Sequence, residues 1–121
     1  MADFLTQELI KVRGWQVAPT ELEAVLLSHP QIVDAAVIGV KHADCEVPLA
    51  FVVRNVETLS ELDVILYLEP RLAKYKRLDG GVHFVTSIPK SISGKILKNL
   101  LRNELLQLQA EKSILATNNT L

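Results

Sequence analysis

Two segments of the sequence carry polar groups at spacings that suit the binding of an anion. Residues 89–96 place Lys95 directly after Ser93 and Gly94, at the predicted start of a helix. Backbone N–H groups, hydroxyls and an ammonium group gathered at such a point suit a phosphate or a carboxylate. The spacing is not that of a Walker A phosphate loop, because no glycine stands five residues before Gly94. An exposed loop lysine that binds nothing explains the same residues equally well.

The other segment, residues 8–23, places polar side chains around a glycine between two short extended pieces. Lys11 and Gln16 stand on either side of Gly14, and Trp15 follows the glycine directly. Because glycine has no side chain, the chain of a ligand can approach the backbone closely there. A solvated hairpin whose turn needs a positive φ at Gly14 explains these residues without a ligand, and on spacing alone it is the simpler interpretation.

Other kinds of site find little support in the sequence. Three histidines stand at no metal-ligand spacing: His29, His42 and His83. We therefore predict no metal site. Cys45 lacks any local sign of a catalytic dyad. Trp15 and Tyr75 are too few aromatic residues for a platform that stacks single-stranded nucleic acid, so we expect no nucleic-acid partner.

Length and composition bound the class of protein. A chain of 121 residues with 49% apolar and 22% charged residues predicts one globular domain and excludes a disordered chain. A single cysteine excludes a disulfide framework. No apolar run approaches the roughly 18 residues of a membrane span, and the first residues lack the basic region of a secretory signal. We therefore expect a cytoplasmic protein with no membrane span.

The formal net charge of −1 hides an asymmetry along the chain. Residues 1–70 hold four basic residues against eleven acidic ones, whereas residues 71–102 hold eight against one. A basic segment of this kind suits an anionic ligand, a nucleic acid or a membrane surface, and a solvated face is the alternative. Lys95 falls in the basic segment, and Lys11 is an isolated cation in the acidic one.

Hydrophobic periodicity, together with Gly and Pro, predicts the elements that position these residues. Two short extended pieces precede a helix that opens at Pro19, with a candidate capping box at residues 20–23. An antiparallel pair of strands follows at residues 32–40 and 49–53, and a third strand at residues 82–88. A second helix is predicted over residues 60–68, with Leu62, Ile65 and Leu66 on its apolar face. A third helix is predicted over residues 96–110. This order predicts an α+β fold: a small three-stranded sheet with a short N-terminal hairpin, packed by about three helices.

Four ordered motifs resemble the C-terminal domain of the adenylate-forming (AMP-binding) enzymes, in the branch of the acyl-CoA and 4-coumarate:CoA ligases. They are E-L-I-K-V-R-G-W-Q-V-A-P-T-E-L-E at residues 8–23, H-P-Q-I-V-D-A-A-V-I-G-V at 29–40, L-A-K-Y-K-R-L-D-G-G-V-H-F-V at 72–85 and I-P-K-S-I-S-G-K-I-L-K at 88–98. The resemblance covers nearly the whole predicted fold.

The resemblance implies a two-step ligase whose small domain rotates on a hinge between the steps. A carboxylic acid reacts with ATP to give an acyl-adenylate and pyrophosphate, and CoA then attacks the adenylate to give a thioester. Lys95 matches the catalytic lysine of the first step, and Lys11 matches a catalytic position that reaches the adenylate after rotation. Five further residues match substrate- and cofactor-binding positions, among them the glycine that lets the pantetheine arm of CoA pass: Gly14, Trp15, Gln16, Ser93 and Gly94.

The first seven residues depart from the resemblance. In the family an Asp-Arg-x-Lys run, whose arginine binds the ribose, precedes E-L-I-K; here residues 4–7 are Phe, Leu, Thr and Gln, and Gln7 occupies the hinge position. We therefore interpret residues 1–7 as an unrelated or truncated segment, residues 8–110 as the domain and residues 111–121 as a frayed tail.

The large N-terminal domain of such ligases, which holds ATP with magnesium and the acyl pocket, has no counterpart among these residues. We therefore expect that the chain is inactive alone, that ATP and CoA are substrates of the parent enzyme, and that the N-terminal domain is its partner. The alternatives are a free-standing binding or interaction module and an inert remnant of a ligase. The resemblance also leaves a peroxisomal parent enzyme open, although residues 119–121 do not read S-K-L.

Overall fold

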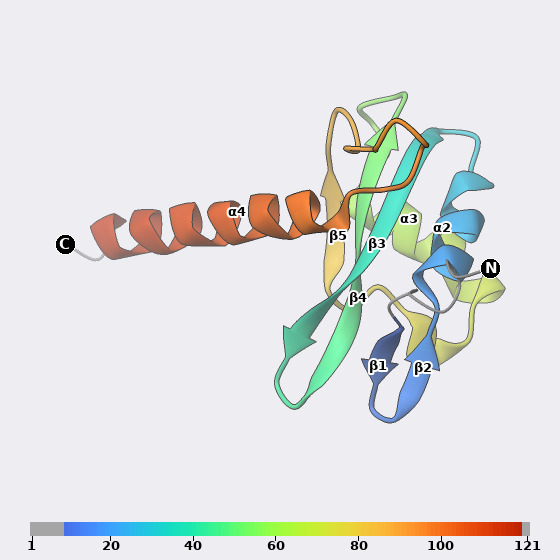
Figure 1. The fold of residues 1–121 in the computed structure, drawn as a ribbon, viewed down its shortest axis with the longest axis horizontal. Coiled ribbons are helices and arrows are strands. Elements are labelled where there is room, and N and C mark those ends of the chain that lie inside the picture. Colours follow the sequence, from blue (N-terminus) through green and yellow to red (C-terminus); the bar gives the residue numbers. More distant parts are fainter. Residues whose placement is uncertain (1–8, 120–121) are drawn as a thin grey trace. The chain divides into compact units, whose positions relative to one another are not determined.

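The computed structural model describes residues 9–119, and their side chains as far as Glu111. Two compact units divide the chain between residues 88 and 89. Within the described residues, the first unit holds a three-stranded sheet, a separate two-stranded hairpin and two α-helices (Figure 1). The second unit holds a loop and one long helix. The predicted α+β class and the predicted order of strands and helices are confirmed.

The sheet is mixed, with the strand order β3-β4-β5. β3 (Ile32–His42) and β4 (Cys45–Arg54) pair antiparallel, as predicted, and β5 (Gly81–Phe84) pairs parallel with β4. β3 and β4 are longer than predicted because residues 41–42 and 45–48 continue the ladder instead of forming a loop. Only Ala43 and Asp44 remain for the turn. β5 is shorter than predicted and does not reach residue 88.

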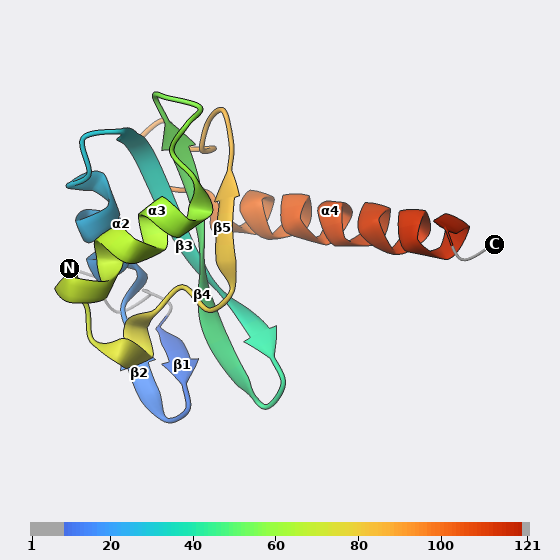
Figure 2. The same ribbon diagram turned by 180° about the vertical axis from the view of Figure 1, so that it is seen from behind.

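One face of the sheet carries the core of the first unit. α2 (Pro19–Leu27) and α3 (Glu61–Leu68) contribute to this core, and Figure 2 shows α3 in front of the strands. Its fully buried members come from the hairpin, both helices and the sheet: Val17, Leu22, Leu26, Val37, Ala50, Val52 and Val64. Because Val17 belongs to the same core, the N-terminal hairpin is packed onto the sheet and does not stand apart from it.

α2 begins as predicted, but not with the predicted cap. Pro19 occupies the first turn, where a missing N–H costs nothing, and the capping position is Ala18, which offers no side-chain hydrogen bond. The capping box expected at residues 20–23 is therefore wrong. Glu23 is buried instead, and its carboxylate accepts a hydrogen bond from the Val37 N–H at 2.9 Å. This bond ties α2 to β3.

α3 buries a different face from the one predicted. Val64 and Leu68 are buried, whereas Leu62 and Leu66 are 62% and 52% exposed. A capping box that the sequence analysis missed starts this helix: the Asp63 N–H donates to the Ser60 hydroxyl and the Ser60 N–H donates to the Asp63 carboxylate. The second of these bonds lowers the pKa of Asp63. In an eight-residue helix that is apolar almost all round, periodicity cannot choose the buried face.

Two single turns of 3₁₀ helix follow α3. η1 (Glu69–Arg71) forms at Pro70, and η2 (Lys74–Lys76) lies before β5. In the second unit α4 (Lys98–Asn119) starts two residues later than predicted, because Ile96 pairs with Lys90 in a short bridge. It continues past its predicted end at Ala110, through a segment without glycine or proline. Among residues 9–119, no helix is both long and apolar enough to cross a membrane.

Candidate functional site

The hairpin of β1 (Ile10–Val12) and β2 (Trp15–Val17) carries the first set of candidate residues. Arg13 and Gly14 form its two-residue turn, with φ angles of 50° and 88°. Two successive positive φ angles give the tight turn whose twist matches that of paired strands. The predicted positive φ at Gly14 is therefore confirmed, and it extends to the residue before it.

Lys11 and Gln16 are direct partners across this hairpin. Both are exposed, whereas Ile10, Val12 and Val17 on the opposite face are buried. The alternation follows from the two-residue period of a strand. The structure thus brings Lys11 and Gln16 together on one exposed surface. Within the described part of the chain, no ion pair or side-chain hydrogen bond engages the Lys11 ammonium.

Gly14 faces open space at the tip of the hairpin. A Cβ atom built at this position would meet no atom within 4 Å. Any side chain there would therefore strain the backbone through the positive φ, without a clash inside the chain. The open space is compatible with a ligand chain passing over the turn, which stays a prediction.

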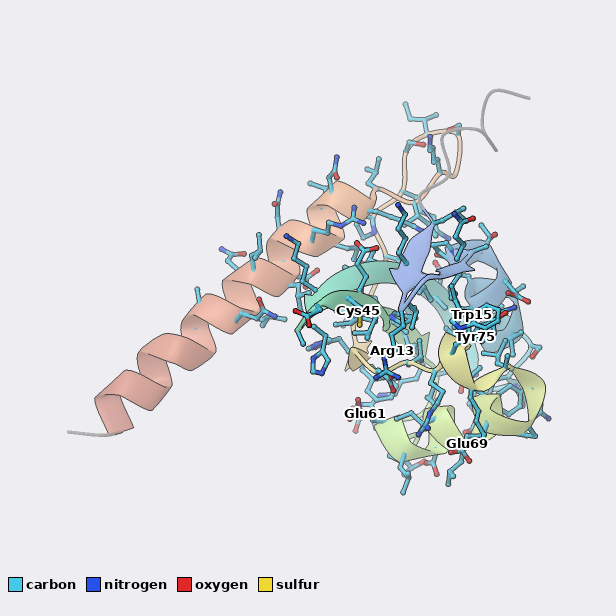
Figure 3. All side chains as sticks on the ribbon, turned by 90° about the horizontal axis from the view of Figure 1, so that it is seen from below. Arg13, Trp15, Cys45, Glu61, Glu69 and Tyr75 are labelled. Carbon is cyan, nitrogen blue, oxygen red and sulfur yellow. The ribbon has the colours of Figure 1, made fainter. Side chains whose placement is uncertain are left out.

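Trp15 stacks on Tyr75, with ring centroids 4.4 Å apart and ring planes at 16°, and Figure 3 shows the two side by side. Trp15 nevertheless remains 56% exposed. Next to Tyr75, the Lys76 ammonium lies 2.6 Å from the Glu21 carboxylate, and its hydrogen bond to this group raises the pKa of Lys76. These contacts join η2 to the hairpin and to α2. The sequence analysis named Trp15 and Tyr75 only as aromatic residues too few to stack nucleic acid, and spacing in the sequence did not predict that the two are in contact.

Lys95 lies in a loop that its own backbone hydrogen bonds close. The bridge between Lys90 and Ile96, together with a hydrogen bond from the Leu97 N–H to the Pro89 carbonyl at 2.9 Å, joins the two ends of the loop. The lysine directly precedes Ile96 of this bridge and is exposed. Its ammonium, like that of Lys11, forms no ion pair within the described residues.

Ser91 organises the inside of this loop with four hydrogen bonds. Its N–H donates to the Lys95 carbonyl at 2.8 Å, its carbonyl accepts from the Gly94 N–H at 2.9 Å, and its hydroxyl accepts from the Lys95 N–H at 3.2 Å. The Ser91 and Ser93 hydroxyls lie 2.9 Å apart, and Gly94 takes a φ of 90°. Ser93, Gly94 and Lys95 are thus held in one preformed turn. Ser91, the first residue of the Ser-x-Ser-Gly run before Lys95, has a structural role in it.

The structure therefore assembles the candidate residues in two groups. Lys11, Gln16, Gly14 and Trp15 share the hairpin in the first unit, and Ser93, Gly94 and Lys95 share the loop in the second. Gln7, the predicted hinge position, lies outside the described residues. No cluster of three or more His, Cys, Asp or Glu side chains that could hold a metal ion occurs in the part that the structure describes.

Comparison with known proteins assigns the chain to one family. Residues 21–95 match the family described as the AMP-binding enzyme C-terminal domain. The chain is 55% identical over 100 residues to a phenylacetyl-CoA ligase of Aspergillus niger, an alignment that covers 81% of this chain and 19% of that protein. It is 46% identical over 100 residues to a probable 4-coumarate–CoA ligase of Dictyostelium discoideum, with 81% and 18% covered.

The chain is also similar to parts of solved structures. ATP-bound MatB from Rhodopseudomonas palustris superimposes with a TM-score of 0.74 at 38% identity, over 81% of this chain and 20% of that one. A fatty acyl CoA synthetase of Mycobacterium tuberculosis superimposes with a TM-score of 0.73 at 36% identity, over 79% and 19%. The chain thus spans about a fifth of the length of the proteins that it matches.

Proposed function

The chain belongs to the family of AMP-binding enzyme C-terminal domains, and from this premise we propose that it is the mobile lid of an ATP-dependent acyl- or aryl-CoA ligase. In the first step of that reaction a carboxylate oxygen attacks the α-phosphate of ATP, and pyrophosphate leaves. In the second step the CoA thiol attacks the carbonyl carbon of the acyl-adenylate, and AMP leaves. The two groups of residues described above serve one step each.

Lys95 serves adenylation in this proposal. An exposed ammonium on a loop whose backbone is already fixed can enter a partner's active site with little further ordering. There its compact charge would orient the carboxylate and stabilise the negative charge that develops around the α-phosphate. Ser93 places a hydroxyl beside it, while the Gly94 N–H is used within the loop by the Ser91 carbonyl.

The hairpin serves thioester formation. Lys11 and Gln16 project together from one exposed face, so that both can reach the adenylate once the domain has rotated. Gly14 leaves the tip of the hairpin open for the pantetheine arm of CoA, with the exposed Trp15 beside it. A rotation between the steps is the kind of domain motion that lets one active site run two reactions.

One observation carries this proposal: both Lys11 and Lys95 are exposed cations without an ion pair in the described part of a domain whose family is established. ATP and CoA are then substrates shared with a larger partner, the N-terminal adenylation domain. That domain would also hold the magnesium that accompanies ATP and the pocket for the acid.

A fusion experiment tests the proposed function. The N-terminal portion of the Aspergillus niger phenylacetyl-CoA ligase, without the segment that this chain matches, is joined to the present chain. We expect the fusion to form phenylacetyl-CoA from phenylacetate, ATP and CoA at least about 10²-fold faster than either part alone, because the chain supplies positioned charges to substrates that the N-terminal portion holds. Thioester formation is followed by liquid chromatography.

The unmodified Aspergillus ligase calibrates the assay, and circular dichroism checks that both parts are folded. Robust pyrophosphate exchange by the 121-residue chain alone would contradict the need for a partner domain. A folded but inert fusion would instead favour a binding module or a remnant.

Gly14→Ala tests the open tip of the hairpin. The substitution strains a positive φ and costs about 1 kcal/mol of stability, but it meets no neighbouring atom. If the pantetheine arm passes over this turn, thioester formation from preformed phenylacetyl-adenylate should slow by about tenfold, because a new methyl group disturbs a close approach. The rate with CoA is measured by stopped flow in the fusion.

Gly94→Ala is the matched variant, because Gly94 also has a positive φ of 90° and no atom within 4 Å of a built Cβ. It introduces the same strain next to Lys95, so it should slow adenylation and spare the second step. Equal slowing of both steps by both variants would show that strain alone explains the losses.

A further inference from the structure

The backbone of Lys11 is oriented by the pairing of its hairpin. In a two-residue hairpin the pair next to the turn, Val12 and Trp15, is the hydrogen-bonded kind, and the kinds then alternate along the ladder. Lys11 and Gln16 form the next pair, which is the non-hydrogen-bonded kind. The N–H of Lys11 therefore points away from β2, to the open edge of the hairpin, where a partner must come from another element.

Glu46 supplies that partner. Its carboxylate accepts a hydrogen bond from the Lys11 N–H at 3.0 Å, across a separation of 35 residues in sequence. Glu46 is half-buried near the start of β4 and lies opposite Lys41 in the β3–β4 ladder. A charged acceptor makes this hydrogen bond stronger than one between neutral groups.

Gly39 leaves room for the contact between the hairpin and the sheet at this point. A Cβ atom at Gly39 would lie 3.2 Å from a side-chain carbon of Ile10 and 3.6 Å from a carboxylate oxygen of Glu46. Ile10, the residue before Lys11, is 3% exposed and packs over this glycine. The hairpin is thus seated on the sheet by an apolar contact at Ile10 and by a directional bond one residue further along.

We propose that Glu46 is a positioning residue for the thioester-forming step, because it fixes the backbone of Lys11 relative to the sheet. The inference rests on the proposed function of Lys11 and goes beyond it, since Glu46 itself need not touch CoA or the adenylate. Packing at Ile10 holds the hairpin against the sheet, whereas the hydrogen bond to Glu46 fixes the orientation and position of the Lys11 backbone relative to β4. A lysine displaced by about 1 Å loses much of its effect on a reaction, so a bond that aims the backbone changes a rate without unfolding the domain.

Three variants of the fusion test this role. Glu46→Ala removes the acceptor, Glu46→Gln keeps a carbonyl oxygen at nearly the same place, and Glu57→Ala is a matched loss of an exposed glutamate elsewhere in the first unit. We expect Glu46→Ala to slow thioester formation from preformed adenylate by about 5- to 20-fold and to leave pyrophosphate exchange within about twofold of the parent. Glu46→Gln should recover most of the rate, and Glu57→Ala should change neither step.

Amide hydrogen exchange in the 121-residue chain gives a readout that is independent of activity. Because no strand covers the Lys11 N–H, we expect its exchange to accelerate by about tenfold or more in Glu46→Ala, while Val17 in the core keeps its protection. Unchanged exchange at Lys11 would overturn the proposal, as would equal slowing of both reaction steps or failure of Glu46→Gln to restore the second.

Lys11→Ala, measured in parallel, distinguishes a failure of the role of Glu46 from a failure of the proposed function of the hairpin. If it slows thioester formation and Glu46→Ala does not, the role of Glu46 is wrong and the proposed function stands. If Lys11→Ala itself leaves that step unchanged, the proposed function of the hairpin fails, whatever Glu46 does.

Discussion

Replacing Lys95 by alanine in the fusion is expected to lower the rate of adenylation by about 10²- to 10³-fold, because removing one preorganised charge from a site of developing negative charge has effects of that size. The loop itself should survive the change. Its shape depends on the backbone of Lys95 and on Ser91, and none of the hydrogen bonds that close it uses the lysine side chain. The loss should therefore be chemical, with the domain still folded.

Pyrophosphate exchange driven by phenylacetate measures this step in isolation. Thioester formation from preformed phenylacetyl-adenylate should stay within about threefold of the parent, since a group that acts only in the first transition state affects only that step. Lys98→Ala, three residues further along at the start of α4, is the control for loss of a lysine in the same unit. Parallel losses in both steps would remove Lys95 from the role proposed for it.

Replacing Lys11 by alanine should have the opposite pattern. We expect thioester formation from preformed adenylate to slow by about 10- to 100-fold, because an ammonium that binds the adenylate and its leaving phosphate is worth a few kcal/mol in a site closed to water. Adenylation should change by less than about threefold. Rapid mixing of the adenylate-loaded fusion with CoA gives the rate of this step directly.

Lys74→Ala provides the matched control, because Lys74 is also an exposed lysine of the first unit and lies outside the hairpin. A fall in pyrophosphate exchange larger than the fall in thioester formation would reverse the assignment of Lys11. The Lys11 side chain is exposed and forms no ion pair among the described residues, so its removal should leave the stability of the domain unchanged within about 0.5 kcal/mol.

Much of the fold follows from local rules. Pro19 marks the start of α2, and Leu22 and Leu26 lie on its buried face as their spacing predicts. The β-branched run from Ile32 predicts β3, and the pair of glycines at residues 80–81 marks the junction between the preceding turn and β5. These features depend on neighbours in sequence, and so one sequence is enough to predict them.

The errors arise where tertiary contacts outweigh a local pattern. Glu23 could have closed a capping box with its own helix, but it bonds the Val37 N–H in the sheet instead. One error has a different origin, since the capping box of Ser60 and Asp63 is a local pattern that the sequence analysis did not predict. The face that α3 buries, at Val64 and Leu68, is set by the sheet beneath it, because the helix itself is apolar on nearly every side.

The candidate residues divide in the same way. The positive φ of Gly14 and the pairing of Lys11 with Gln16 follow from the hairpin pattern alone. The stack of Trp15 on Tyr75 and the bond from Lys11 to Glu46 join segments that lie 60 and 35 residues apart, and no local rule brings them together. Such contacts decide how the hairpin is aimed, which is why the geometry of the site needed the structure.

The most direct test of the account is the quotient of the two step rates, adenylation over thioester formation, measured in one fusion with Lys95→Ala and with Lys11→Ala. If the two lysines serve separate steps, Lys95→Ala lowers this quotient by about 10²-fold or more and Lys11→Ala raises it by about tenfold or more, so the two variants move it in opposite directions. A quotient that shifts in the same direction in both variants, or that stays at the parent value while both rates fall, would contradict the division of labour between the loop and the hairpin.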